Sequence, residues 1–80
     1  MSGFPMRLDP PYKFYPKVLS DDVGGGVIYV GSAAAGTATS DDKWQIKKIT
    51  TTASTATIVF AGGKPHFDQV WNNRTSLSYS

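Results

Sequence analysis

Hydrophobic and polar positions alternate in several short runs of the chain, which is the pattern of β-strands that bury one face. The clearest run is KWQIKKI, residues 43–49, in which Trp44 and Ile46 share one side. Lys43 and Lys47 fall on the other side, where their ammonium groups can stay in water. The run therefore predicts a half-buried strand.

The alternation breaks at Ile49, which falls on the side of the lysines. A β-bulge at Lys47 and Lys48, with two residues facing one on the partner strand, would return Ile49 to the apolar side. The run TATIVFA, residues 55–61, alternates again. We expect it to form a hairpin with residues 43–51.

Two further strands are predicted earlier in the chain. Residues 12–19 are rich in aromatic side chains, but Pro16 cannot donate to a strand ladder, so this is an edge strand or one that ends early. Residues 27–31, VIYVG, are short and β-branched. The glycine-rich residues 20–26 between them predict a loop, and the two strands are expected to pair around it.

The last segment changes period, because its apolar positions are spaced like one face of a helix. Residues 66–74 are too few for a helix that is stable alone, so we expect one or two turns that pack on the sheet. Residues 76–79 then predict a short closing strand. The positions with helical spacing are Phe67, Val70, Trp71 and Arg74, the last of which is expected to bond a carboxylate or carbonyl groups.

These elements predict a mainly β fold, a small antiparallel sheet or sandwich of about five strands with a helical turn before the last strand. Residues 12–80 are expected to form one β domain after an extended arm, residues 1–11. The large apolar and aromatic side chains of the strands and the turn are needed for the core of so small a domain. The predicted core residues are Phe14, Tyr29, Trp44, Ile46, Ile49, Ile58, Phe60, Phe67, Val70, Trp71, Leu77 and Tyr79.

The arm, residues 1–11, carries three of the five prolines, which keep it out of a helix. Phe4, Met6 and Leu8 alternate in it, so an extended chain presents all three on one side. This stripe predicts an interface in which the arm lies along a neighbouring subunit and buries Phe4.

The composition adds a reason to expect association. The chain has 80 residues, and a domain of this size buries only about 60% of the surface that its unfolded chain exposes. It has no cysteine, which removes disulfides and thiolate metal sites, and it has one histidine and no glutamate. Of the usual ways to stabilise a small domain, contact with partner chains is the one that remains.

The net charge is +2, which is low for a protein that depends on contacts with many phosphates. No apolar run approaches the roughly 20 residues that a membrane-spanning helix needs, and the first residues lack the apolar segment of a signal peptide. We therefore expect a soluble protein that is made in a cytoplasm, with no membrane partner.

Candidate chemical sites are weak. His66 and Asp68 are close enough to share a metal or relay a proton, but the pattern supplies no distinctive nucleophile and also fits a surface histidine. The glycines of VGGGV, residues 23–27, lack the lysine and the helix of a phosphate loop. Two aspartate doublets do not have the spacing of a calcium loop. We therefore expect no catalytic, cofactor or metal site; the doublets are Asp21, Asp22, Asp41 and Asp42.

Lys43, Lys47 and Lys48 around Trp44 raise a second possibility, a small nucleic-acid-binding protein. Single-strand binding requires an exposed aromatic face beside the cations, on which bases can stack. The alternation places Trp44 with Ile46, on the side opposite Lys43 and Lys47. This pattern favours a structural strand over a nucleic-acid site.

The segment VIYVGSAAAGTATSDDKWQIKKI and the ending FDQVWNNRTSLSYS resemble small proteins encoded in the genomes of tailed bacteriophages. The resemblance covers residues 27–80 and leaves out the arm. Its most specific positions are Gly36, Thr37 and Ala38, then Trp44 and Ile46, and the ending Phe67, Trp71, Asn73, Arg74, Leu77 and Tyr79.

The resemblance implies a virion structural component, synthesised in the cytoplasm of the bacterial host, and not an enzyme. Its partners would be other copies of itself and other virion proteins, and its place would be the tail or the fibre-attachment region. Head decoration is the alternative within the particle. A nucleic-acid-binding accessory protein is the alternative from another class.

Overall fold

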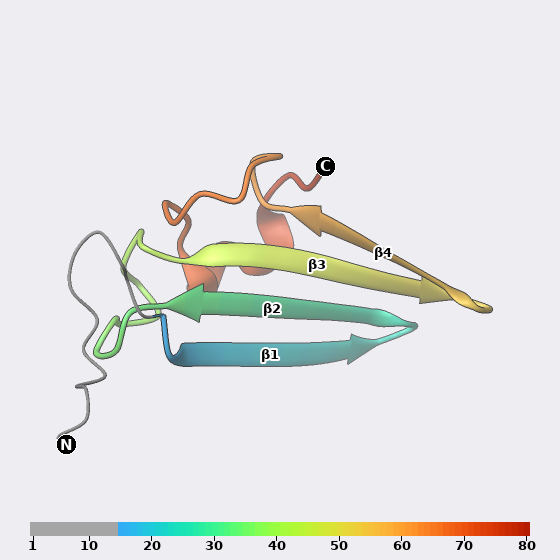
Figure 1. Cartoon of the computed structure of the whole chain (residues 1–80), viewed down its shortest axis with the longest axis horizontal. Coiled ribbons are helices and arrows are strands. Elements are labelled where there is room, and N and C mark those ends of the chain that lie inside the picture. Colours follow the sequence, from blue (N-terminus) through green and yellow to red (C-terminus); the bar gives the residue numbers. More distant parts are fainter. Residues whose placement is uncertain (1–14) are drawn as a thin grey trace, which may run out of the picture.

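The structure, a computed structural model, describes residues 15–80. Its strands form one antiparallel sheet in the order β1-β2-β3-β4, so each strand pairs with its neighbour in the chain (Figure 1). The mainly β prediction is confirmed, with four strands in place of five. The elements are β1 Lys17–Gly24, β2 Val27–Ala33, β3 Gln45–Thr52, β4 Thr55–Phe60 and a 3-10 helix, η1 Trp71–Ser76.

The β1–β2 hairpin is longer than the sequence predicted. β1 begins directly after Pro16 and continues through residues 20–24, which were expected to be a loop. The turn consists only of Gly25 and Gly26, both with positive φ, 65° and 81°. A two-residue turn with positive φ at both positions matches the right-handed twist of the strands, so the residues before it can pair.

The predicted bulge in β3 is wrong. Pairing with β2 and with β4 runs without a shift, and it places Lys47 opposite Val30 and Lys48 opposite Tyr29. Ile49 therefore lies on the opposite face from Ile46. Lys48 takes the inward position because it lies at the margin of the core, where its ammonium nitrogen is 5.7 Å from the centre of the Tyr79 ring.

The C-terminal segment covers one face of the sheet. In Figure 1, η1 lies behind β3 and appears on both sides of that strand. The two tryptophans meet beneath it, with ring centres 5.8 Å apart, and Trp44 is fully buried. Leu19, Val27, Leu77 and Tyr79 pack against the margin of this core. Its buried residues are Tyr29, Ala33, Trp44, Ile46, Ala61 and Trp71.

Gly31 makes room for Trp71 at the centre of β2. A Cβ atom at this position would stand 2.5 Å from Cε3 of the Trp71 ring and 3.0 Å from Cε3 of Trp44. Such distances are far below van der Waals contact, so a side chain here would displace the ring. Glycine in a strand commonly marks such a close approach, and here it lets an indole ring lie directly on the sheet backbone.

Arg74 ties η1 to the edge of the sheet. Its Nε donates to Oδ2 of Asp21 on β1 at 2.9 Å, and its Nη1 donates to the Trp71 carbonyl at 3.2 Å. The guanidinium also lies over the Trp71 ring, 4.6 Å from its centre. The expectation that Arg74 bonds a carboxylate and a carbonyl group is confirmed.

The segment before η1 is extended and not helical. Gln69 exchanges backbone hydrogen bonds with Trp44, so the helix starts at Trp71 and not at Phe67. Phe67 instead stacks on Tyr15, with ring centres 4.0 Å apart. The predicted closing strand is reduced to one isolated bridge, between Ala61 and Tyr79.

Five described residues of the predicted core lie outside it. Phe67 and Val70 are half-buried, on the segment before η1. Ile49, Ile58 and Phe60 are on the face of the sheet that η1 does not cover, and Ile58 is 55% exposed. The alternation correctly divided the side chains of each strand into two sets, one for each face of the sheet. It could not show which of the two sets of β4 the C-terminal segment would cover. The residues Phe4, Met6, Leu8 and Phe14 lie outside the described residues.

Removal of the Trp71 ring should open a cavity between the sheet and η1. We expect Trp71→Ala to lower the free energy of unfolding by about 3–5 kcal/mol, which is most of the stability of a small domain. This loss in the free energy of unfolding can be measured by urea denaturation monitored by far-UV circular dichroism. Asn72→Ala, an exposed position of the same helix, is the control and should change stability by less than about 0.5 kcal/mol. Equal stabilities of the two variants would contradict this packing.

The β3–β4 turn contains a correctable strain. Ala53 has a φ of 51°, and no other residue with a side chain in the described chain has a positive φ. Glycine adopts this conformation without the Cβ penalty, although it also loosens the unfolded chain. Ala53→Gly should therefore raise stability by about 0.5 kcal/mol, measured as an increase in melting temperature. Ser54→Gly, the neighbouring turn position, should instead lower it.

Candidate functional site

The face of the sheet that η1 leaves uncovered, called here the open face, is the main candidate for a functional surface. Strand geometry places every second side chain of the four strands on it. Six of these side chains are apolar and larger than alanine, and they come from all four strands. They are Val18, Ile28, Val30, Ile49, Ile58 and Phe60.

The apolar side chains of the open face form a continuous area. Ile28, Ile49 and Ile58 are directly paired across three strands and make one row. The next row contains Val30 and Phe60, with Lys47 between them. Neighbours on the same face of a sheet lie within contact distance, so these rows present one joined apolar surface.

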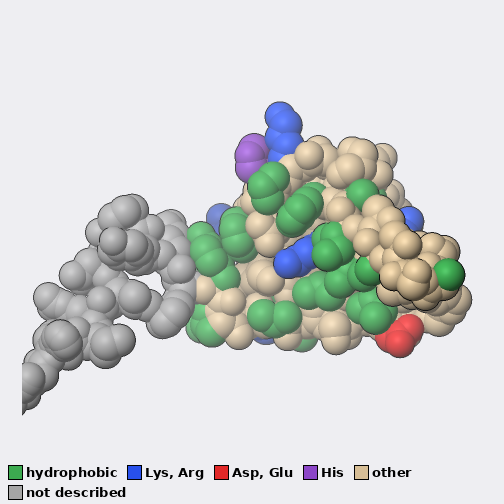
Figure 2. All heavy atoms as spheres, turned by 45° about the vertical axis from the view of Figure 1, so that its right-hand side comes forward, with side chains coloured by type: hydrophobic (Ala, Val, Ile, Leu, Met, Phe, Trp, Pro, Cys, Tyr) green, Lys and Arg blue, Asp and Glu red, His purple; other side chains and the backbone are tan. Residues whose placement is uncertain are grey.

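The area is exposed to solvent in the described structure. Val18 and Ile58 are 56% and 55% exposed, and the other four side chains are half-buried by their neighbours on the sheet. Figure 2 shows hydrophobic side chains gathered over the strands on this side of the molecule, with a basic side chain among them. A contiguous apolar area of this kind is typical of an interaction surface.

Charged and polar groups border the apolar rows. Lys47 lies within them, and Asp22 ends the isoleucine row on β1, opposite Ile28. One oxygen of Asp22 accepts a hydrogen bond from the Gly24 amide at 2.9 Å. Gln45 donates to the Pro65 carbonyl at 2.9 Å, which fixes the loop after β4 beside the open face. The open face thus carries one cation and one anion.

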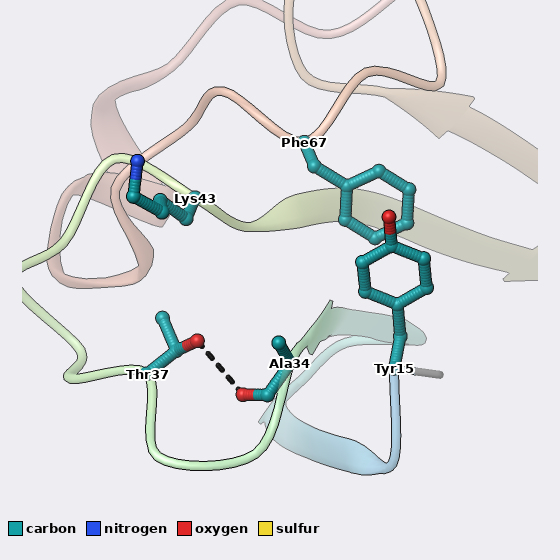
Figure 3. Close-up of a pocket in the computed structure, with 5 residues that line it drawn as sticks. All are labelled: Tyr15, Ala34, Thr37, Lys43 and Phe67. Carbon is teal, nitrogen blue, oxygen red and sulfur yellow. Dashed lines mark hydrogen bonds between the residues drawn. The ribbon is translucent and has the colours of Figure 1, made fainter. Parts of the chain in front are cut away.

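A small hollow lies where the described chain begins (Figure 3). Tyr15 stacks on Phe67 on one side of it, and Thr37 and Lys43 stand on the other. Its volume is about 240 Å³, and its lining holds one cation and no carboxylate. Thr37 uses its hydroxyl to bond the Ala34 carbonyl at 2.7 Å, so this group is already engaged. The hollow presents no arrangement of nucleophile and base.

The residues that the sequence offered for chemistry are not assembled into a site. His66 and Asp68 are exposed, and Oδ1 of Asp68 accepts a hydrogen bond from the adjacent Gln69 side chain at 3.1 Å. Among residues 15–80, no group of three His, Cys, Asp or Glu side chains is placed to hold a metal ion. The glycines of VGGGV end β1 and form the β1–β2 turn, and a strand follows them where a phosphate loop has a helix.

The lysine and tryptophan cluster is divided between the two faces. Trp44 is fully buried, and its Nε1 donates to the Ala38 carbonyl at 2.9 Å. Its ring is therefore not available to stack on a base. Lys47 stands on the open face, and Lys48 stands on the covered face beside Tyr79.

Several residues that position the covered face were not found by the sequence analysis. Thr37 is buried, and its backbone carbonyl accepts a hydrogen bond from Nζ of Lys17 at 2.7 Å. Small residues fill the space beneath the tryptophans, with Ala33 at 0% and Ala61 at 2% exposure. A sequence pattern gives no signal for these positions, except that a glycine within a strand, Gly31, indicates a close approach.

Comparison with known protein families, with curated proteins and with solved structures finds no match to this chain. Within the part of the chain that the structure describes, no helix has the length and apolar character needed to cross a membrane.

The proton affinity of the Tyr79 phenol clearly departs from its usual value. Burial raises the pKa of this phenol to about 12, with Tyr29 acting in the same direction and Arg74 against it. Its hydroxyl donates to the Arg74 carbonyl at 2.7 Å. Because the folded protein holds the phenol neutral, its contribution to stability is complete below about pH 10 and is lost as the pH rises toward 12.

The Tyr79 pKa predicts an alkaline loss of stability that Tyr79→Phe reduces. At neutral pH the variant should be less stable by about 1 kcal/mol, because the hydroxyl bond to the Arg74 carbonyl is lost. Between about pH 10 and 12 the stabilities of the two proteins should converge, since only the parent can ionise this ring. Urea denaturation across that range measures both, and parallel curves would contradict the assignment.

Proposed function

We propose that the protein is a structural component of a tailed-phage particle that acts through assembly contacts. The observation that carries the proposal is the open face, an apolar surface formed by all four strands and exposed among residues 15–80. A small domain gains little by leaving its branched side chains in water unless another surface covers them.

The construction of the domain is in keeping with this role. Its covered face is filled by side chains of its own C-terminal segment, with no ligand-sized space between Trp44, Gly31 and Trp71. The hollow at Tyr15 and Phe67 carries no reactive pair among its lining residues. The surface with most area to offer a partner is therefore the open face.

The sequence resemblance supports a place in a virion. Some of the residues that carry the resemblance lie on the sheet, such as Trp44 and Ile46. Others lie on η1, which packs against the sheet, such as Trp71 and Arg74. These residues build the scaffold that displays the open face. Tail or fibre attachment is the proposed location, and head decoration is the second choice.

The arm, residues 1–11, supplies a second proposed contact. The outer edge of β1 has no partner strand among the described residues, so its backbone groups are free to pair. An extended segment can add to such an edge through main-chain hydrogen bonds, while alternate side chains fill pockets. The stripe of Phe4, Met6 and Leu8 has that spacing.

Particle composition tests the proposal. Purified particles of the phage that encodes this chain should contain it at a fixed copy number, measured by quantitative mass spectrometry. Deletion of residues 1–11 should leave a folded domain that fails to enter particles, while His66→Ala and Asp68→Ala should enter at the normal number and leave infectivity intact. Absence of the parent protein from particles would overturn the proposal. A salt-dependent shift of DNA on gels would support the nucleic-acid alternative.

A further inference from the structure

The sheet has the form of one half of a β-sandwich. One face is closed by the chain itself, and the other presents alternating apolar side chains on four strands. Two such faces pack about 10 Å apart with their strands nearly aligned, and their side chains interdigitate. The isoleucine row of Ile28, Ile49 and Ile58 gives the face β-branched side chains of similar height, which suits this packing.

The size of the open face fits a second copy of the chain. Four strands spaced by about 4.8 Å, each contributing about six residues, cover roughly 20 by 20 Å. When two such faces close on each other, they bury on the order of 1,000 Å² in total, which is the lower limit for a specific stable interface. The area of the open face is therefore just large enough for a stable dimer interface.

The charges of the open face are self-complementary. Asp22 stands on β1 in the isoleucine row, and Lys47 stands two strands away on β3 in the adjacent row. A two-fold axis in the plane of the interface, running between β2 and β3, covers all four strands and lays β3 of one copy over β2 of the other, next to its β1. Each Lys47 then reaches Asp22 of the second copy, and the exchange is reciprocal as an isologous contact requires.

This pairing solves the problem that Lys47 presents to any apolar partner. An ammonium group closed into an apolar interface without an anion costs several kcal/mol. A lysine stem can run along apolar surface and carry its charge to the border, where the adjacent row places the carboxylate. Asp22 uses one oxygen for the Gly24 amide, so its second oxygen is available for the contact.

We propose that the open face binds a second copy of this chain, face to face, so that two sheets form a β-sandwich with Lys47 of each copy paired to Asp22 of the other. This deepens the assembly role proposed above by naming the partner and the contact. It concerns the purified chain alone and needs no other virion protein.

The first test is the oligomeric state of the full chain. Light scattering after size exclusion should show a dimer at micromolar concentration, and the melting temperature should rise with concentration. Ile58→Asp should weaken the dimer by about 100-fold or more, because it closes an unpaired carboxylate into the apolar interface. Thr57→Asp is the matched control, an exposed neighbour on the other face of β4, and should leave the dimer intact.

Charge exchange tests the partner and the orientation together. Lys47→Asp alone and Asp22→Lys alone should each weaken the dimer by about tenfold or more, because each places like charges together. The double variant with both changes should recover most of the loss, since the pair is restored with its signs reversed. Such recovery within a single kind of chain occurs only if the chain pairs with itself.

Three results would overturn the inference. A full chain that stays monomeric in the micromolar range would do so, as would a dimer that Ile58→Asp leaves intact or a double variant no tighter than the single ones. A monomer that dimerises only after residues 1–11 are deleted would assign the open face to the arm. The assembly role is tested separately, since a monomer that enters particles at a fixed copy number retains that role and loses only the dimer.

Discussion

The contact between the Trp71 ring and the backbone of Gly31 is the constraint on which the rest of the structure depends. It fixes the height of η1 above the sheet, since the indole lies directly on β2 and beside Trp44. It also places Arg74 over the same ring and within reach of Asp21 on the edge strand. One side of the sheet is thereby closed by the chain itself, and the other side stays open among the described residues.

The asymmetry between the two faces explains how a domain of this size divides its hydrophobic residues. Two tryptophans, a tyrosine and small residues fill the covered side, where close packing of a short segment against a sheet requires large flat rings over small positions. The open face instead uses branched aliphatic side chains in rows. Folding of one chain uses the first set, while the second set contributes fully only when another surface covers it.

Sequence reasoning found the strands through their alternation. It found Trp44, Ile46 and Trp71 as core residues because they are large apolar side chains at strand or helix spacing. It placed Ile49 wrongly, since it assumed one apolar face per strand and explained the second isoleucine by a bulge. β3 in fact has apolar residues on both faces. An argument from alternation expects one apolar and one polar face, so it cannot accommodate such a strand. The open face could be recognised only after the register of all four strands was known, because its residues are distant in the chain.

The position of Trp71 along the chain also determines the order in which the protein can reach its native state. All four strands leave the ribosome before the residues that cover them, so the early sheet exposes apolar side chains on both of its sides. Closure of the first side requires contacts between residues far apart in sequence, which form slowly. A nascent chain is therefore most exposed to aggregation in the interval before η1 docks.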